Sequence, residues 1–150
     1  MKVEIKKDQS VQAAYVEIHC KEITTDVTRL KTYIDNYKTG IKGSQDGEVH
    51  IVPLNEILYV ETVDKKTFIY TESKVLGSDK RLYEIEELLD GRDFFRCSKS
   101  VIINLTKVTK LKPEITRNIL ATLTNGEVVV VSRRYAVELK KLLGIGGQNE

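Results

Sequence analysis

The sequence predicts a mostly β protein with minor helices, an α+β architecture overall. The chain of 150 residues contains about nine short apolar runs rich in β-branched residues, which favour extended backbone. Three other stretches space their apolar residues as one face of a helix does. Strands and helices do not alternate along the chain, so we expect antiparallel pairing rather than a parallel βαβ sheet.

The composition is that of one small globular domain with a short extension. The hydrophobic fraction of 41% supports a core, and 31% of residues are charged. No apolar run approaches the ~20 residues that a membrane helix needs, and the first residues lack the apolar core of a signal peptide. We therefore expect a cytoplasmic protein.

The residues that usually form metal or catalytic sites are few and scattered. Cys20 and Cys97 stand alone, and His19 and His50 are the only histidines. No metal-ligand spacing, nucleophile–base set or phosphate-binding glycine loop is evident. The sequence therefore predicts no metal, no cofactor, no small-molecule substrate and no enzyme activity.

Charge is distributed unevenly, although the net charge is only +2. Residues 46–90 hold five Lys or Arg and eleven Asp or Glu, whereas residues 91–150 hold eleven and five. A basic final third can supply a phosphate-binding surface that the average charge conceals.

Residues 1–45 predict two strands followed by an amphipathic helix. The segments 2–7 and 15–20 alternate apolar and polar residues. Side-chain oxygens that can cap the helix are offered by Thr24, Thr25 and Asp26. The glycine-rich segment 40–47 reads as a loop and as the boundary of this extension. The apolar stripe of the helix either packs on the domain or mediates self-association, and it consists of Val27, Leu30, Ile34 and Tyr37.

Residues 49–71 predict three strands. Pro53 interrupts the first strand, which suits either an edge strand or the end of a strand. The next two, 57–63 and 67–71, form a hairpin with Asp64, Lys65 and Lys66 at its tip. The two lysines either contact a phosphate backbone or only keep the tip solvated.

Residues 80–89 predict a helix capped by Asp79, with a carboxylate-rich solvated face. Paired carboxylates can act in acid–base catalysis, but no partner nucleophile accompanies them here. The expected buried stripe consists of Leu82, Ile85, Leu88 and Leu89, and the exposed carboxylates are Glu84, Glu86 and Glu87.

The stretch 94–104, FFRCSKSVIIN, predicts a strand, a short polar loop and a second strand. Ser98, Lys99 and Ser100 place one cation between two hydroxyls, which can bond phosphate oxygens, and Lys99 can also reach a guanine edge. A solvated surface loop is the alternative explanation. Alternation directs Cys97 inward, although nearby cations leave a redox-active thiol as a second possibility.

The final segment predicts a short strand at 108–111, a hairpin and a helix. Strands 119–123 and 128–131 flank an Asn-Gly turn. Ser132 can cap the helix that follows, and Gly144 ends it. Because arginines oppose the dipole at a helix N-terminus, their presence there indicates a nearby anion; these arginines are Arg133 and Arg134.

Three blocks together resemble the LytTR DNA-binding domain, a family of bacterial transcription regulators. They are ILYVETVDKKTFIYT, FFRCSKSVIIN and LTNGEVVVVSRRYAVELKKLLG. The blocks occur in the family's order, and the segment that they span, residues 57–144, covers a little under two thirds of the chain. The S-K-S form of the central loop is similar to that of the short, stand-alone members, which have no receiver domain and often accompany a small membrane protein.

The resemblance implies an elongated stack of small antiparallel sheets whose inter-strand loops enter the grooves of double-stranded DNA. It divides the chain into an extension at 1–45, a DNA-binding domain at 46–145 and a tail at 146–150. A homodimer is expected, because small DNA readers often bind repeated half-sites. The alternative function is a cytoplasmic interaction module for a small membrane protein. The implied DNA-contacting residues are Lys65, Lys66, Arg96, Ser98, Lys99, Ser100, Arg133 and Arg134.

Overall fold

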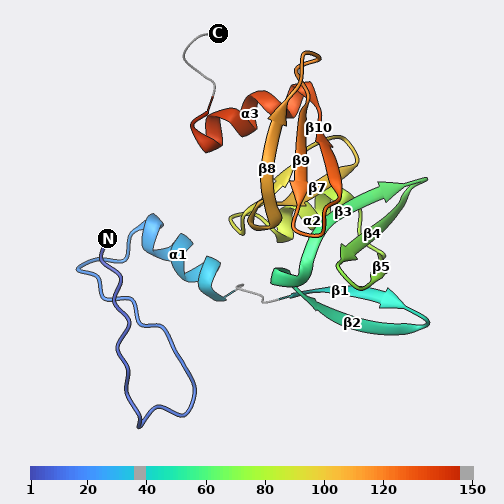
Figure 1. Cartoon of the computed structure of the whole chain (residues 1–150). Helices are drawn as coiled ribbons and strands as arrows, with labels where there is room; N and C mark the ends of the chain where they lie inside the picture. Colours follow the sequence, from blue (N-terminus) through green and yellow to red (C-terminus); the bar gives the residue numbers. More distant parts are fainter. Residues whose placement is uncertain (36–39, 146–150) are drawn as a thin grey trace. The chain divides into compact units, whose positions relative to one another are not determined.

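The chain divides into two compact units, which are treated separately. The computed structural model describes residues 1–35 and 40–145 (Figure 1). Unit 1 covers Met1–Lys38, and unit 2 covers Thr39–Glu150. No helix in these described ranges is long and apolar enough to cross a membrane.

Unit 1 contains one helix, α1 (Thr25–Asp35), preceded by irregular chain. The predicted cap is confirmed, because Thr24 Oγ1 accepts a hydrogen bond from the Val27 amide at 3.3 Å. The predicted strands at 2–7 and 15–20 are wrong, since residues 1–24 form no strand. A strand needs a neighbour for its backbone groups and a face to bury, and the side chain of Ile5 is 98% exposed.

The apolar stripe of α1 is only partly covered. Val27, Leu30 and Ile34 are half-buried, and α1 has no buried residue. Tyr37, the fourth member of the predicted stripe, lies outside the described residues. The stripe is therefore a surface feature of this unit.

Unit 2 is organised around a seven-stranded antiparallel sheet with the order β2-β1-β5-β4-β3-β7-β6. Its strands are β1 (Gly40–Gln45), β2 (Glu48–Pro53), β3 (Ile57–Val63), β4 (Lys66–Thr71), β5 (Val75–Ser78), β6 (Phe94–Arg96) and β7 (Val101–Asn104). The predicted edge position of the strand that contains Pro53 is confirmed, because β2 ends the sheet.

The glycine-rich segment predicted as a loop is mostly strand β1. Glycines usually indicate a loop, but here they allow a close approach between strands. A Cβ atom on Gly43 would lie 2.9 Å from Cβ of Leu76 on β5. The loop itself shrinks to a turn at Asp46 and Gly47, which both have positive φ.

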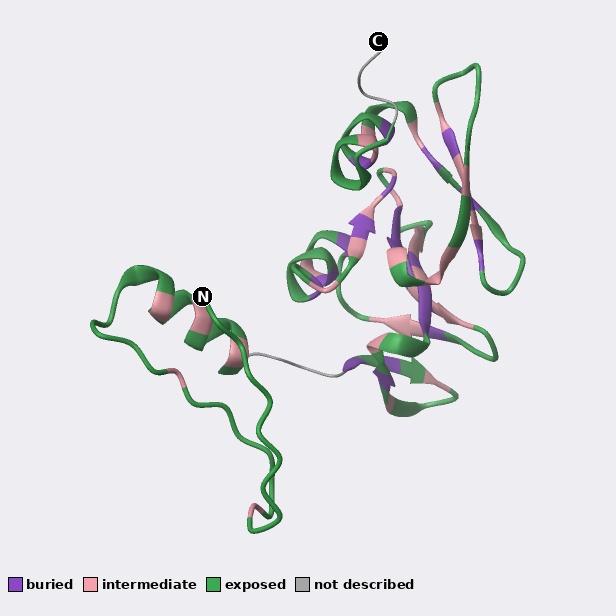
Figure 2. Cartoon of the chain, turned by 60° about the vertical axis from the view of Figure 1, so that its left-hand side comes forward, coloured by how far each residue is buried: buried purple, intermediate pink, exposed green. Residues whose placement is uncertain are grey.

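A three-stranded sheet of β8 (Val108–Pro113), β9 (Ile119–Leu123) and β10 (Val128–Val131) packs on one face of the larger sheet, together with α3 (Arg133–Leu143). The other face is covered by α2 (Leu82–Leu88). Short 3-10 turns, Leu54–Glu56 and Leu105–Lys107, precede β3 and β8. Two cores result, one on each face, as the buried segments in Figure 2 show.

Helix α2 begins later than predicted, and Asp79 does not cap it. Arg81 occupies the N-cap position, and its amide donates to Glu84 Oε1 at 3.0 Å. Leu82, Ile85 and Leu89 are buried as expected, but Leu88 is 41% exposed. The three buried residues fill the face that α2 presents to the sheet, and Leu88 therefore points to solvent.

Candidate nucleic-acid interface

The tip of the β3–β4 hairpin is a two-residue turn that presents lysines to solvent. Asp64 and Lys65 have φ values of 49° and 65°, the left-handed region that the tightest hairpin turns require. The side chains of Lys65 and Lys66 are exposed. The hairpin therefore carries two cations at its projecting end, as predicted.

The loop between β6 and β7, residues 97–100, is fixed through its backbone and is called the signature loop below. Each of its four carbonyl oxygens accepts a hydrogen bond. Those of Ser98 and Lys99 receive Nε and Nη2 of Arg96, at 2.7 and 2.6 Å. Those of Cys97 and Ser100 receive the amides of Ser132 and Thr62, at 2.9 and 2.8 Å.

Arg96 is thus directed at the loop backbone rather than at solvent. Its third bond runs from Nη1 to Glu86 Oε1 on α2, at 3.1 Å, and only 20% of its side chain is exposed. Strand alternation explains this direction, because Phe94 and Arg96 lie on the sheet face that α2 covers. The geometry gives Arg96 a shaping role in the loop.

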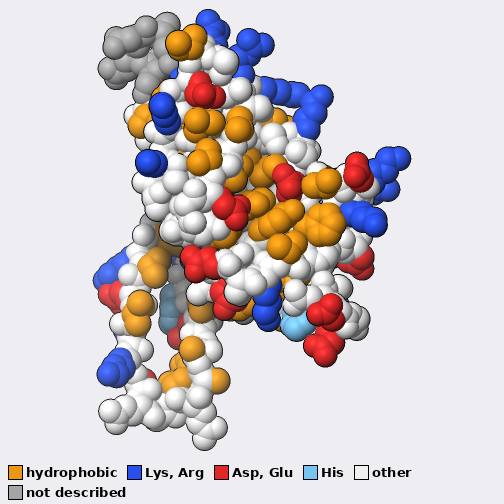
Figure 3. Space-filling model, turned by 45° about the vertical axis from the view of Figure 1, so that its right-hand side comes forward, with side chains coloured by type: hydrophobic (Ala, Val, Ile, Leu, Met, Phe, Trp, Pro, Cys, Tyr) orange, Lys and Arg blue, Asp and Glu red, His pale blue; other side chains and the backbone are white. Residues whose placement is uncertain are grey.

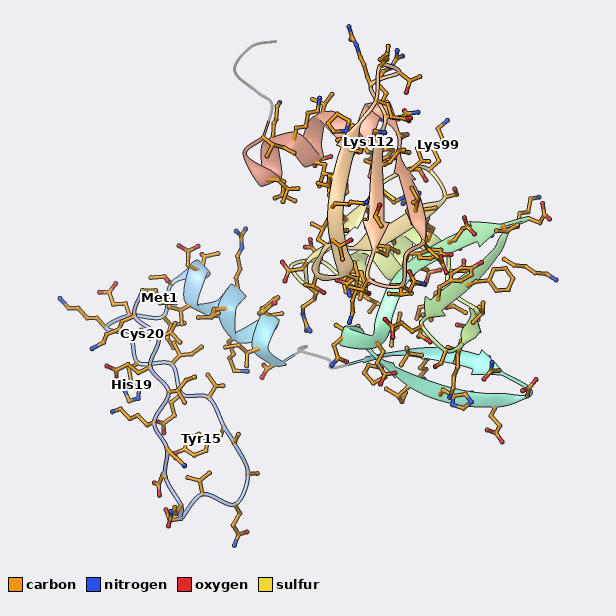
Figure 4. The ribbon with its side chains drawn as sticks, in the orientation of Figure 1. Met1, Tyr15, His19, Cys20, Lys99 and Lys112 are labelled. Atoms are coloured by element: carbon orange, nitrogen blue, oxygen red, sulfur yellow. The ribbon has the colours of Figure 1, made fainter. Side chains whose placement is uncertain are left out.

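The side chains of the signature loop divide between internal and outward positions. Ser98 Oγ accepts from the Ser100 amide at 3.2 Å and lies 3.4 Å from Ser100 Oγ, so the hydroxyls partly support the turn. Lys99 is exposed and projects outward at the upper end of unit 2 (Figure 4). The single cation of the loop is the group offered to a partner.

Cys97 lies at the base of this loop and is fully buried. Burial raises the pKa of its thiol to about 12, despite the nearby cation of Arg96. At neutral pH the thiol is protonated and covered. This environment supports the prediction of a buried residue and opposes a redox-reactive thiolate.

The start of α3 is attached directly to the signature loop. The bond from the Ser132 amide to the Cys97 carbonyl joins them, and the exposed Arg133 and Arg134 follow immediately. Ser132 occupies the N-cap position, but its side chain makes no capping bond. Asn118 replaces it, since Asn118 Oδ1 accepts from the Arg133 amide at 2.9 Å.

Asn104 is a structural residue. It is 2% exposed, and its Nδ2 donates to the carbonyls of Leu54 and Ile57 at 3.4 and 2.8 Å. Its Oδ1 accepts from the amide and hydroxyl of Thr106. These bonds give Asn104 the role of holding the local shape of the backbone.

Two stacked tyrosines and two carboxylates lie beside the basic elements. The rings of Tyr59 and Tyr70 are 4.4 Å apart between centroids, and the Tyr70 hydroxyl donates to Glu61 at 3.3 Å. The pKa of Tyr59 is raised mainly by burial and secondly by Glu127. The pKa of Tyr70 is raised mainly by burial and secondly by Glu61. Both phenols are therefore neutral and can hydrogen-bond the carboxylates.

The structure brings the predicted residues together along a short backbone path. Thr62 of β3, near the lysine tip, binds the signature loop, which in turn binds the start of α3. Lys and Arg side chains gather at the upper end and right-hand edge of unit 2 in Figure 3, with apolar and acidic side chains between them. Cations arranged in this way can bind phosphates at several points, and the longest of these Lys and Arg side chains can extend to the edges of the bases.

Sequence reasoning missed the residues that support this arrangement, namely Thr62, Glu86 and Asn118. Glu86 was expected only as part of a solvated helix face. None of the three stands in a local pattern that indicates its partner, which is 15 or more residues away for Thr62 and Asn118. Among the described residues, no group of three or more His, Cys, Asp or Glu is placed to hold a metal ion.

Similarity to known proteins supports the same interpretation. The LytTr DNA-binding domain family matches residues 47–144. A LytTr DNA-binding domain from Bacillus cereus superposes with a TM-score of 0.69 and 32% identity, over 73% of this chain and 100% of that one. The sensory transduction protein LytT of Enterococcus faecalis is 29% identical over 100 residues, which are 67% of this chain and 41% of LytT.

Relatives of similar length are named as regulators. HTH-type transcriptional regulators of Staphylococcus aureus, themselves uncharacterised, are 26% identical over 147 residues, 97% of this chain and 99% of theirs. In the described part of this chain, the strands β6 to β10 separate α2 from α3, so these helices do not form a helix-turn-helix. With the family matched over most of the chain and the fold shared with a solved domain, the chain belongs to the LytTR family of DNA-binding domain proteins.

Proposed function

We propose that this protein is a transcriptional regulator that reads double-stranded DNA with three basic points of unit 2. These are the β3–β4 tip, the signature loop and the start of α3. The observation that carries the proposal is the fixation of the signature loop, in which four bonded carbonyls leave Lys99 as the outward group. Because the backbone that carries Lys99 is already ordered in the free protein, little conformational entropy is lost when Lys99 binds DNA.

The three points have different roles. Lys65, Lys66 and Arg133 engage phosphates and fix the register of the protein on DNA. Lys99 and Arg134 approach guanine edges, where a good bidentate contact gives about 1–3 kcal/mol of discrimination. Arg96 contributes by shaping the loop. The hydroxyls of Ser98 and Ser100 stand beside Lys99, where an O–H group can donate to a phosphate oxygen.

A titration of the purified protein against the DNA upstream of its own gene, and against a scrambled duplex, tests this function. At two salt concentrations, we expect a preference of about a thousandfold for the specific site and weaker binding as salt rises. Arg134→Ala should weaken specific binding and relax one base position. Absence of binding to either duplex at low salt would overturn the proposal.

Unit 1 supports a second role, in self-association or in receiving a signal from a protein partner. The observation that favours it is the half-buried stripe of Val27, Leu30 and Ile34 on α1, which no described residue of unit 1 fully covers. We expect a homodimer, and a small membrane protein is the second candidate partner. Both roles place the protein in the cytoplasm, where bacterial DNA is accessible.

Leu30→Glu separates these roles from DNA reading. If the stripe joins two copies, sedimentation should show a shift from dimer to monomer, with reduced affinity for paired half-sites and unchanged affinity for a single one. A wild-type protein that sediments as a monomer on and off DNA would exclude the homodimer. Co-purification with a membrane protein, lost in Leu30→Glu, would instead indicate signal reception.

A further inference from the structure

We infer that Glu86 of α2 is a positioning residue for DNA reading, which acts on the signature loop through the guanidinium of Arg96. The inference rests on the proposed function, but it concerns a helix that contains none of the residues expected to contact DNA. Glu86 joins this helix to the loop by its 3.1 Å bond to Arg96 Nη1.

The first step is the dependence of the loop on one side chain. Two of the four loop carbonyls are bonded to backbone amides of neighbouring elements, so the fold itself holds them. The other two, of Ser98 and Lys99, are bonded through Arg96 alone among the residues that the structure describes. These are the carbonyls on either side of the Lys99 amide and side chain, so the direction of Lys99 depends on where the guanidinium lies.

The second step is the dependence of that side chain on Glu86. A guanidinium is a planar fork, so a carboxylate that fixes one nitrogen also fixes the plane of the other two. The Arg96 side chain is 20% exposed and the Glu86 side chain 46% exposed. Without the carboxylate, the cation is drawn toward water or toward an incoming phosphate, and each such movement releases the loop.

The third step is electrostatic. Arg96 is bonded to the backbone of the loop that carries Lys99, and an unpaired cation there would attract phosphates regardless of sequence. Glu86 neutralises it. The pair thus limits non-specific attraction while it supports the outward cation of Lys99, so Glu86 favours specific over non-specific binding in two ways.

The chain offers a matched control. Glu86 and Glu138 line one hollow of about 240 Å³ between α2, β6 and α3, together with Arg96 and Tyr135. Among the described residues, the guanidinium bonds to Glu86 and not to Glu138. Substitution of either carboxylate by alanine changes the net charge equally, so a general charge effect on DNA binding cancels in the comparison.

The experiment measures affinity for a duplex that the wild-type protein selects from a randomised pool, and for a scrambled duplex. Glu86→Ala should lower specific affinity about tenfold, ~1.4 kcal/mol, while binding to scrambled DNA stays equal or strengthens. Glu138→Ala should change both affinities by the same factor. Glu86→Gln, which keeps an oxygen acceptor, should restore part of the loss, and Arg96→Lys should reproduce it because an ammonium cannot bridge three acceptors in this geometry.

A measurement without DNA separates this inference from the proposed function. Backbone ¹⁵N relaxation of residues 98–100 in the free protein should show greater mobility in Glu86→Ala than in wild type or Glu138→Ala, at equal thermal stability. If the wild type prefers no duplex, the proposed function fails while the relaxation result still decides the role of Glu86. An equal specific-to-scrambled ratio in both alanine variants, or an unchanged loop in Glu86→Ala, would overturn the inference.

Discussion

The signature loop and the β3–β4 tip carry similar charge but are held in opposite ways. The signature loop is bonded at four carbonyls by donors from β3, β6 and α3. Within the described part of the chain, the hairpin tip is held by its own strands alone and projects with exposed lysines. A fixed loop suits base edges, which demand exact hydrogen-bond geometry, whereas long lysines on a projecting turn suit phosphates, which accept many geometries.

The two elements also differ in backbone strain. Lys65 has a φ of 65°, a conformation that few residues other than glycine, asparagine and aspartate adopt readily. A lysine there costs about 1 kcal/mol relative to glycine. No described residue of the signature loop has positive φ. The strain is therefore confined to the hairpin tip, and the signature loop is free of it.

The largest expected effect concerns Cys97, whose covered thiol depends on a closed signature loop. With its pKa raised to about 12 by burial, the thiol should react with a maleimide at pH 8 at least about a thousandfold more slowly than the exposed Cys20. Cys20→Ser leaves one slow thiol, and denaturant should expose it. Rapid labelling of that variant in the folded state would show that the loop opens, which would remove the contrast with the hairpin tip.

Asn104→Ala should give the next largest effect. The substitution leaves the carbonyl of Ile57 and the amide of Thr106 without their partner beside the strand that leads to the loop. The expected loss is about 3 kcal/mol in the free energy of unfolding, measured by urea titration. Thr106→Val, which removes only the hydroxyl contact, should cost less, and equal losses would mean that the amide is not the organising group.

Lys99→Ala tests the specificity that is assigned to the fixed loop. Discrimination should fall by about 1–3 kcal/mol at one base pair and stay unchanged elsewhere, as measured with single-substitution duplexes. Lys110→Ala removes an equal charge from the exposed face of β8 and serves as the control. A uniform loss across all duplexes would assign Lys99 to a phosphate and erase the distinction between the loops.

Lys65→Gly should give the smallest change, and it tests the phosphate role that is proposed for the β3–β4 tip. Relief of positive φ should stabilise the protein by up to about 1 kcal/mol, while the salt dependence of DNA binding should decrease by about one phosphate contact. Asp64→Gly relieves similar strain without losing a cation, so its salt slope should not decrease. A sequence-selective loss in Lys65→Gly would contradict the phosphate role.

The parts of the fold that depend on neighbouring residues could be predicted from the sequence. The bounds of β3, β9 and β10 match the predicted strands, because alternation and the Asn-Gly turn are local signals. The family and its mostly β fold were also correctly identified. The errors arose where strand pairing decides the structure. The glycine-rich β1 is a strand because it pairs along its whole length with β2 and also pairs with β5. The N-terminal segments are not strands because they have no pairing neighbour among the described residues.

The candidate site shows the same division. Its loops could be located from residue types, since cations between apolar runs are a local pattern. The direction of Arg96 could not be predicted, because it depends on which sheet face α2 covers. Asn118 replaced Ser132 as the cap of α3 for a comparable reason, since the two segments meet only after β9 and β10 pair.

The bond between the Ser132 amide and the Cys97 carbonyl has a consequence for the operator. It ties the backbone of the signature loop to the start of α3 and so limits how far the separation between Lys99 and the arginines can change. Under the proposed function, DNA whose spacing does not match this separation bends or twists to meet both groups, at a cost that depends on the flexibility of the base steps between them. We therefore expect affinity to vary with easily kinked steps, such as TA or CA, at positions that no side chain touches.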